Sequence, residues 1–556
     1  MFHHRKSRLN WVPAKRVKSF TTRSATASLR DQSSPAAKAL TIQATKPPES
    51  KGAHQHSAWC FNVGCIISRH LPRQPISSSP DRDPQSSASA PPRLRGYGRD
   101  CRDLLVAQSI QSMHARLGPL ASNRERSISR QWPTSTDTQS TDERWESRPA
   151  GLWIKKSPKR TDPSKLVTGV DVLFGADAVD PRTNWQVQDR GLFIDNNGDN
   201  PEPRLTVRKG PAIKVEKPVP RIRKDGKFKI MQAADLHLST GLGKCRDALP
   251  KGQPCEADPR TLEFVERLID DENPDFVVLT GDQVNGDTAP DAQTAIFKYS
   301  EMFAKHKIPY AGIFGNHDDE GNLDRAESMA IMDGLPYSLS TAGPEDVEGV
   351  GNYVVEILGR GSTSHSALTL YMLDTHSYSP DERQYRGYDW LKKSQIEWFK
   401  STSQSLKRKH KEYTHIHMDL AFIHIPLPEY RNPDQLKWVG NWTEPPTAPA
   451  YNSNFKDALV EEGVVAVSCG HDHVNDYCLP ALDKDKKKPA LWMCYGGGAG
   501  FGGYGGYYGY HRRIRFFDFD MNEGRIHTWK RLEWGDTERR IDEQIIVDGG
   551  KVVVDM

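Results

Sequence analysis

Residues 229–241 read KIMQAADLHLSTG, an apolar run that leads straight into Asp235 and, two positions later, His237. Four further apolar runs end in the same way, each followed closely by acidic, amide or imidazole side chains. They are 276–280 before Asp282, 310–314 before Asn316 and His317, 420–423 before His424, and 464–468 before His471 and His473. Helical patterns lie between several of these runs, and strands that alternate with helices predict an α/β fold.

The polar residues that follow these strands are expected to converge. In layered α/β proteins the carboxyl ends of neighbouring strands meet at one edge, where ligands bind. The collected side chains are carboxylates, an amide and imidazoles without a thiolate, which suits manganese, iron or zinc. A carboxylate such as Asp282 can bridge two cations, and paired cations stabilise in-line displacement at phosphorus. The sequence therefore predicts a site for two metal ions and leaves their identity open.

Composition divides the 556 residues into unequal parts. Residues 1–140 are rich in Ser, Pro and Arg, and they are predicted to be disordered because they offer too little apolar surface to offset chain entropy. Residues 141–216 carry short apolar clusters between turns and are predicted to form a small β-rich unit. The α/β domain is expected over 217–535, and a C-terminal β-hairpin around Gly549 and Gly550 within 536–556.

Charge and hydropathy limit the classes of partner. The formal net charge is +4 without a clustered basic face, so no nucleic-acid partner is expected. No run of 18 apolar residues exists, and no membrane span is expected. A soluble intracellular protein is the favoured expectation. The first 30 residues lack acids, which leaves mitochondrial import open, and the sequon at Asn441 would matter in the secretory pathway.

The eight cysteines lack a C-x-x-C spacing, which argues against a disulfide scaffold or a thiolate zinc site. Cys245 and Cys255 flank a Gly/Pro-rich loop and are the exception. The sequence leaves two states of this pair equally open, one disulfide or two free thiols.

The glycine- and tyrosine-rich segment 496–510 has two readings. It forms either a flexible rim where Tyr504 and Tyr507 touch a phosphorylated partner, or a loose loop, which its glycine content slightly favours. Arg512 and Arg513 follow it, and they either clamp phosphate or point into solvent.

Five short motifs resemble the calcineurin-like metallophosphoesterase superfamily. They are D-x-H at 235–237, G-D at 281–282, G-N-H-D at 315–318, the lone His424, and G-H-x-H at 470–473. Each motif alone is weak, but five in the superfamily's order, each after a strand, are specific. The resemblance covers about residues 225–530. It implies an α/β/β/α sandwich of two mixed sheets packed face to face with helices outside.

The superfamily pattern implies a role for each matching residue. It assigns Asp235, His237 and His473 to a first metal ion, Asn316, His424 and His471 to a second, and Asp282 to both. A hydroxide that bridges the ions would attack phosphorus.

His317 would not bind metal in this pattern but would protonate the leaving oxygen, a role worth about 10²–10⁴-fold in rate. In some members an aspartate three positions after the bridging residue supports this histidine, whereas this chain has Asn285 there. Asp318 or Asp374 is therefore expected to keep His317 protonated.

Longer stretches resemble a fungal branch of the superfamily, described as cell-cycle or stress-signalling phosphatases and related to plant purple-acid-phosphatase-like proteins. They are residues 229–241, DERQYRGYDWL at 381–391, IHIPLPEY at 423–430 and GHDHVNDY at 470–477. The resemblance implies hydrolysis of phosphomonoesters, with a phosphorylated protein or a small phosphomonoester as substrate. Two alternatives stay open: a phosphodiesterase or nucleotide hydrolase on the same metals, and a non-catalytic interaction protein that retains the fold.

Overall fold

A computed structural model of the protein describes residues 40–44, 145–147, 150, 152–156, 162–192, 201–410, 416–432, 436–485, 488–506 and 509–554. These residues all lie in the unit Ala39–Met556. They form three β-sheets, two of which carry the candidate site. No helix within these residues is long and apolar enough to cross a membrane.

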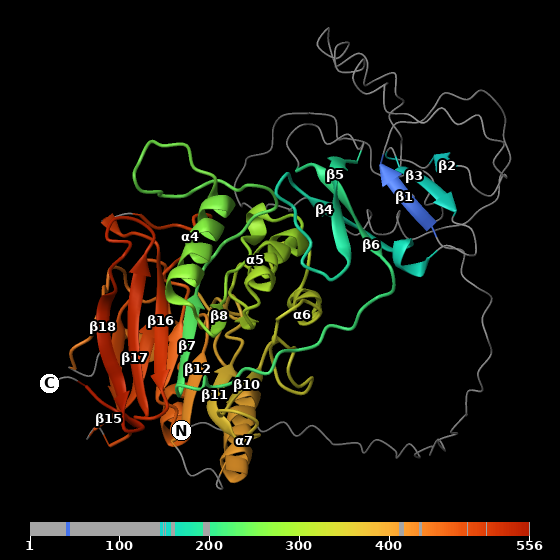
Figure 1. The fold of residues 1–556 in the computed structure, drawn as a ribbon. Helices are drawn as coiled ribbons and strands as arrows, with labels where there is room; N and C mark the ends of the chain where they lie inside the picture. Colours follow the sequence, from blue (N-terminus) through green and yellow to red (C-terminus); the bar gives the residue numbers. More distant parts are fainter. Residues whose placement is uncertain are drawn as a thin grey trace, which may run out of the picture. The chain divides into compact units, whose positions relative to one another are not determined.

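The first large sheet has seven strands in the order β19-β18-β17-β16-β7-β8-β9. Figure 1 shows β18, β17, β16 and β7 side by side. Its parallel strands are β7 (Lys227–Ala233), β8 (Phe276–Thr280) and β9 (Tyr310–Ile313). Its antiparallel strands are β16 (Arg513–Asp520), β17 (Arg525–Leu532), β18 (Ile541–Asp548) and β19 (Lys551–Val552). Every residue of β8 and β9 is buried, which explains why their sequences are continuously apolar rather than alternating.

The second large sheet has six strands in the order β10-β11-β12-β13-β15-β14. Four of them run parallel: β11 (Ser366–Met372), β12 (Met418–Phe422), β13 (Ala466–Cys469) and β15 (Pro489–Tyr495). The edge strands β10 (Tyr353–Leu358) and β14 (Cys478–Leu482) are antiparallel to their neighbours. Both large sheets are therefore mixed.

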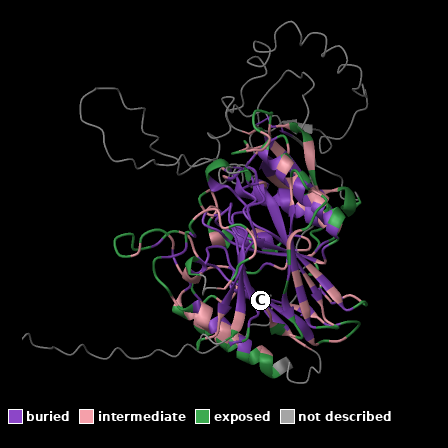
Figure 2. Cartoon of the chain, turned by 90° about the vertical axis from the view of Figure 1, so that its left-hand side faces the viewer, coloured by how far each residue is buried: buried purple, intermediate pink, exposed green. Residues whose placement is uncertain are grey.

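The two large sheets pack against each other through one apolar core. Ile230 and Phe276 of the first sheet meet Leu368 and Leu420 of the second in this core. Helices α4 (Ala257–Glu272), α5 (Ala292–His306) and α6 (Arg325–Asp333) pack with the first sheet in a separate core. Helices α7 (Lys393–His410) and α8 (Phe455–Glu461) pack with the second. Buried residues run along the strands between these layers (Figure 2). The predicted α/β/β/α sandwich of two mixed sheets is confirmed.

A third, antiparallel sheet precedes the sandwich in sequence. Its order is β2 (Trp145–Ser147), β3 (Leu152–Lys156), β1 (Leu40–Ala44), β4 (Val167–Phe174), β6 (Pro203–Lys209) and β5 (Trp185–Gly191). Strand β1 comes from the segment predicted to be disordered, and it forms because its backbone pairs with β3 and β4. The rest of residues 1–140 lies outside the described residues. The backbone N–H of Phe174 donates to Thr294 of α5 at 3.0 Å, which ties this sheet to the sandwich.

The C-terminal hairpin forms between β18 and β19 around Gly549 and Gly550, both with positive φ. Strand β18 also pairs with β17, so this hairpin extends the seven-stranded sheet. Three short 3₁₀ turns complete the described elements: η3 (Pro163–Lys165), η4 (Gly286–Thr288) and η5 (Pro428–Arg431).

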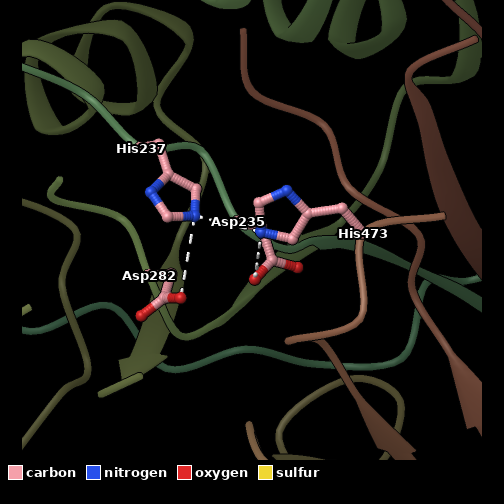
Figure 3. A group of neighbouring side chains, drawn as sticks. All are labelled: Asp235, His237, Asp282 and His473. Carbon is pink, nitrogen blue, oxygen red and sulfur yellow. Dashed lines mark hydrogen bonds and ion pairs between the residues drawn. The ribbon is translucent and has the colours of Figure 1, made fainter. Parts of the chain in front are cut away.

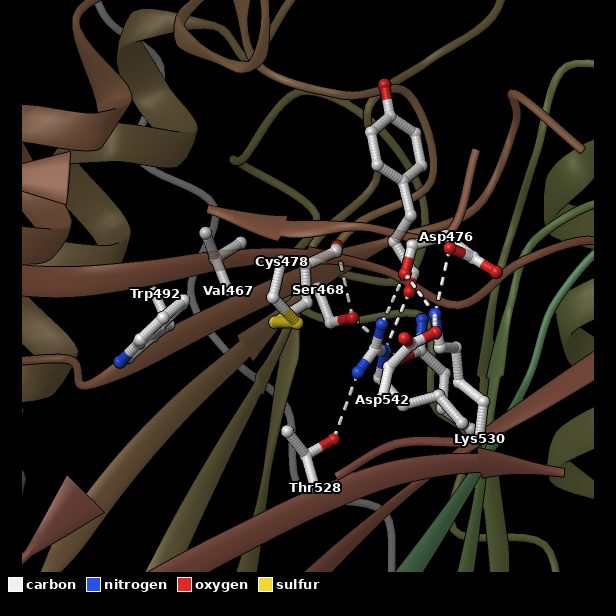
Figure 4. Close-up of a disulfide and its surroundings, with 12 residues drawn as sticks. Val467, Ser468, Asp476, Cys478, Trp492, Thr528, Lys530 and Asp542 are labelled. Carbon is white, nitrogen blue, oxygen red and sulfur yellow. Dashed lines mark hydrogen bonds and ion pairs between the residues drawn. A yellow bond between two sulfur atoms is a disulfide. The ribbon is translucent and has the colours of Figure 1, made fainter. Parts of the chain in front are cut away.

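Two disulfides are present among the described residues. Cys245 and Cys255 are bonded, which decides between the two states that the sequence left open. Cys478 and Cys494 are also bonded (Figure 4), a pair that the spacing of the cysteines did not predict. The β14–β15 register places these two residues directly opposite each other, and a spacing of 16 residues does not reveal such a register.

A buried charge network lies beside the second disulfide (Figure 4). The Lys530 ammonium is 2.8 Å from Asp476 and 2.6 Å from Asp542, and Arg513 also pairs with Asp476. The Arg512 guanidinium donates to the backbone carbonyl oxygens of three residues, Arg246, Gly500 and Gly503. Arg512 and Arg513 are therefore neither solvated nor free to clamp phosphate, because protein acceptors already occupy them.

Candidate active site

The side chains singled out in the sequence meet where the parallel strands of both large sheets end. Asp235, Asp282 and Asn316 follow β7, β8 and β9, and His424 and His471 follow β12 and β13. These five side chains are buried. The seven-stranded sheet thus supplies the carboxylates and the amide, and the six-stranded sheet supplies only imidazoles from the predicted set.

The first cluster consists of Asp235, His237, Asp282 and His473 (Figure 3), with potential ligand atoms within 4.8 Å of one another. His237 Nε2 lies 3.1 Å from His473 Nε2 and 3.6 Å from an oxygen of Asp282. His473 Nε2 lies 3.5 Å from Asp235. Two imidazole lone pairs at this separation repel unless a proton or a cation lies between them, so the cluster has the form of a cation site.

The second cluster consists of Asp282, His424 and His471. His424 Nε2 lies 3.3 Å from Asp282 Oδ2, and it is equally distant from His471 Nδ1 and from Asn316 Oδ1. Asp282 Oδ2 also faces His237, so one carboxylate oxygen belongs to both clusters. The structure therefore brings together all seven residues predicted to bind metal.

The outward nitrogen of three histidines is already engaged. His424 Nδ1 donates to the Thr280 carbonyl oxygen at 2.8 Å, and His473 Nδ1 donates to the Tyr504 carbonyl oxygen at 2.8 Å. His237 Nδ1 lies 3.4 Å from the Asn285 side-chain oxygen. A proton on the outward nitrogen leaves a lone pair on the inward one, which is the arrangement of metal-binding histidines. His471 Nε2 is buried without a hydrogen-bond partner among the described residues. The nitrogen and oxygen donors present fit two divalent or trivalent ions.

Burial sets the protonation of the clusters. It raises the pKa of Asp235 to about 8 and lowers the pKa of His237 to about 4. It also holds the pKa values of His471 and His473 well below their ordinary range. Burial alone would lower the pKa of His424 too, but the charge of Asp282 raises it to about 9. The three imidazoles whose pKa is lowered are neutral beside the Asp282 carboxylate, which favours cation binding because a bound cation would compensate the desolvated negative charge.

The backbone at the site is unusual. Asp235, His237, Asp282 and His471 have φ values of 57°, 47°, 52° and 79°, in the left-handed region that non-glycine residues rarely adopt. Glycines allow the close approach that these turns need. A Cβ atom at Gly315 would lie 2.1 Å from the Asp282 carboxylate. The glycines of the G-D and G-N-H-D motifs are therefore needed for steric reasons, and the polar residues of these motifs for their chemistry.

His317 stands beside the clusters, and its partner is a residue that sequence reasoning missed. Its side chain is 32% exposed, and its Nδ1 lies 2.6 Å from Glu320 Oε2. Tyr378 donates its hydroxyl to the other Glu320 oxygen at 3.0 Å. Burial alone would lower the pKa of His317, but the bond to Glu320 and the charge of Asp282 raise it to about 9. Glu320 stands three positions after His317 in the stretch NHDDE at 316–320, and this spacing could have indicated the pair.

The two carboxylates expected to support His317 act elsewhere. Asp318 accepts the backbone N–H groups of Asp282, Val284 and Gly315 at 2.6–2.9 Å and thereby fixes the loop between them. Asp374 pairs with Arg325 at 2.7 Å. Neither carboxylate is the one bonded to the imidazole, because the strand-end turns point them into backbone and arginine donors.

A small cavity opens over the clusters, and its rim comes from loops. Tyr504 stacks on His473 at 4.0 Å between ring centroids and donates its hydroxyl to Glu444 at 2.7 Å. Tyr388 sets its ring edge-on to His471 at 4.2 Å. Tyr504 thus belongs to the rim, whereas Tyr507 lies outside the described residues.

Two cation sites that share an aspartate at the edge of a two-sheet sandwich, with a histidine beside them, define a metal-dependent phosphoesterase. The family model for calcineurin-like phosphoesterases matches residues 228–475, and the chain belongs to this family.

The chain is similar to Phosphatase DCR2 of Saccharomyces cerevisiae, with 41% identity over 69% of this chain and 67% of the relative. It is 33% identical to "Probable inactive purple acid phosphatase 28" of Arabidopsis thaliana, over 62% of this chain and 88% of that protein. A dimetal phosphatase structure from Danio rerio aligns with 57% of this chain and 98% of its own at 13% identity and a TM-score of 0.37.

Proposed function

We propose that this enzyme hydrolyses phosphomonoesters, with phosphorylated proteins of signalling or cell-cycle control as its substrates. One observation carries the proposal: Asp282 Oδ2 lies 3.6 Å from His237 Nε2 and 3.3 Å from His424 Nε2, so it faces both clusters at once. A shared carboxylate is the element that a pair of adjacent cations needs. The 41% identity to a yeast phosphatase supports the choice of a monoester.

In this proposal each residue has a defined task. Asp235, His237 and His473 hold one ion, Asn316, His424 and His471 hold the other, and Asp282 holds both. The bound ions would activate water and neutralise charge on the phosphoryl oxygens. The buried protein shell around them holds the pKa values of His237, His471 and His473 low and fixes the donor atoms, which reduces reorganisation during the reaction.

His317 supplies the proton for the leaving oxygen. Its Nδ1 is bound to Glu320, so its Nε2 is the nitrogen that can present a proton to the cavity. Tyr378 fixes the second oxygen of Glu320, and its own hydroxyl is 3.4 Å from Asn316 Nδ2. The acid is thus linked through Glu320 and Tyr378 to a residue of the metal site. In the proposal Asp318 shapes the loop and does not move a proton.

The test is hydrolysis by the full chain after removal and stepwise return of manganese, iron and zinc, with metal content measured in parallel. Phenyl phosphate, its bis(phenyl) diester and phosphoserine peptides are the substrates. Faster turnover of the monoesters, dependent on two ions per chain, supports the proposal. Faster turnover of the diester would favour a phosphodiesterase. A metal-loaded protein without activity on any of them would favour a non-catalytic interaction protein.

A further inference from the structure

A loop at the cavity mouth carries a cation that has no bonded partner among the described residues. Arg246 lines the same cavity as His237 and His317, and its side chain is exposed. Within the described residues its guanidinium makes no hydrogen bond or ion pair. No other lysine or arginine of the described part of the chain lines this cavity. An anion inside the cavity therefore meets Arg246 as the one permanent cation among the lining side chains that the structure describes.

The backbone beneath this free side chain is held firmly. The Arg246 N–H donates to the Phe501 carbonyl oxygen at 2.8 Å, and its own carbonyl oxygen accepts from Arg512 at 3.0 Å. The preceding residue is crosslinked by the Cys245–Cys255 disulfide. The following residue, Asp247, accepts the N–H of Gly505 at 3.2 Å. An exposed charge on a backbone that is held at these points is partly preorganised for binding, because little backbone entropy is lost when the ligand arrives.

The position of Arg246 indicates which part of a substrate it would contact. The ligand side chains are at most 7% exposed, whereas Arg246 stands in solvent at the mouth. The transferred phosphoryl group belongs at the buried clusters, so Arg246 faces the portion of the substrate beyond it. His317, which serves the leaving oxygen in the proposed function, lines the same cavity. The portion beyond the phosphoryl group is therefore the leaving group.

We propose that Arg246 is a specificity-determining residue that pairs with a carboxylate on the leaving group, so that acidic phosphopeptides are the preferred substrates. This inference rests on the proposed function and names its substrate class. A guanidinium suits this task because its planar fork of donors matches a carboxylate. The lining carboxylates Asp287 and Asp472, which are not among the predicted metal ligands, disfavour acidic peptides, and Arg246 offsets that repulsion where the peptide enters.

The test compares two phosphoserine peptides that differ only in flanking Asp or Asn residues. For the wild-type protein we expect kcat/KM for the Asp peptide to exceed that for the Asn peptide about three- to five-fold, the size of an exposed ion pair. Arg246→Gln should bring this ratio to about one. Lys244→Gln removes the same charge two residues earlier, at an exposed side chain outside the cavity lining, and should keep the wild-type ratio. Added salt should reduce the wild-type ratio as well.

The outcomes separate the inference from the function beneath it. Hydrolysis of phenyl phosphate by the metal-loaded wild-type protein reports on the proposed function alone. Given that activity, equal kcat/KM for the two peptides, no turnover of either peptide, or a ratio that Arg246→Gln leaves intact would overturn the inference. A wild-type protein inactive on phenyl phosphate and on both peptides would overturn the proposed function itself.

Discussion

The floor and the rim of the cavity are built in different ways. The floor consists of the two ligand clusters, whose residues follow strands of two packed sheets and are buried. The rim consists of Arg246, Tyr388, Thr447 and Tyr504, which come from loops far apart in the sequence. The floor residues are held in position by strand ends in a packed core, which allows only small movements. The position of each rim residue depends on a few loop contacts.

This difference separates binding of the ions from choice of the substrate. Changes in the floor should abolish metal binding and activity together. Changes in the rim should leave the ions bound and alter rates by smaller factors. His317 and Glu320 lie between the two regions, since they adjoin the clusters but are not among the predicted ligands.

The largest effect is expected at the shared ligand. Asp282→Asn should lower kcat/KM for phenyl phosphate by about 10³-fold or more, because both cation sites lose a charged donor. Metal content per chain should fall in the same preparation. Asp287→Asn makes the same chemical change at an exposed carboxylate in the cavity and should retain both ions. A fully loaded, active Asp282→Asn protein would remove the distinction between floor and rim.

The next largest effect is expected at the acid. His317→Asn should lower kcat for phenyl phosphate by about 10²–10⁴-fold while both ions stay bound. The loss should shrink for dinitrophenyl phosphate, whose leaving oxygen needs little protonation. An equal loss for both esters would show that His317 acts on binding or structure and does not supply a proton.

A smaller effect is expected at Glu320. Glu320→Gln should lower kcat about tenfold for phenyl phosphate and less for dinitrophenyl phosphate, because the imidazole keeps its place but loses its charged partner. Tyr378→Phe, which removes the hydroxyl bonded to the other Glu320 oxygen, should cost a few-fold. If both esters slowed to the same extent, Glu320 would have a structural role alone.

The smallest effect is expected on the rim. Tyr504→Phe keeps the ring stacked on His473 and removes the hydroxyl, which donates to Glu444 at 2.7 Å and accepts the backbone N–H of His473 at 2.9 Å. We expect kcat/KM to change by less than about tenfold, the value of two modest hydrogen bonds, and metal content to stay at the wild-type level. Loss of an ion in this variant would place Tyr504 functionally in the floor.

The same contrast explains what the sequence could predict. Asp235, Asp282 and His424 were predictable because each stands within two residues of an apolar strand, and strand ends converge by topology. Glu320 was missed although it stands three positions after His317, because that spacing brings the two side chains together only through the turn that follows Asn316. Arg512 and Arg513 were misread because a sequence does not show which carbonyl oxygens or carboxylates will surround a buried guanidinium. The Cys478–Cys494 bond likewise required the register of two strands.

The fact that both large sheets contribute to each cluster affects the stability of the fold. Each cluster takes donors from both large sheets, so a bound ion fastens one layer to the other at their common edge. Binding that requires the folded arrangement adds to the free energy of unfolding, by about 2.7 kcal/mol per site at a free ion concentration one hundred times the dissociation constant. The melting temperature should therefore rise with metal supply and fall with chelation. The stability of the fold thus depends on the free metal concentration around the protein.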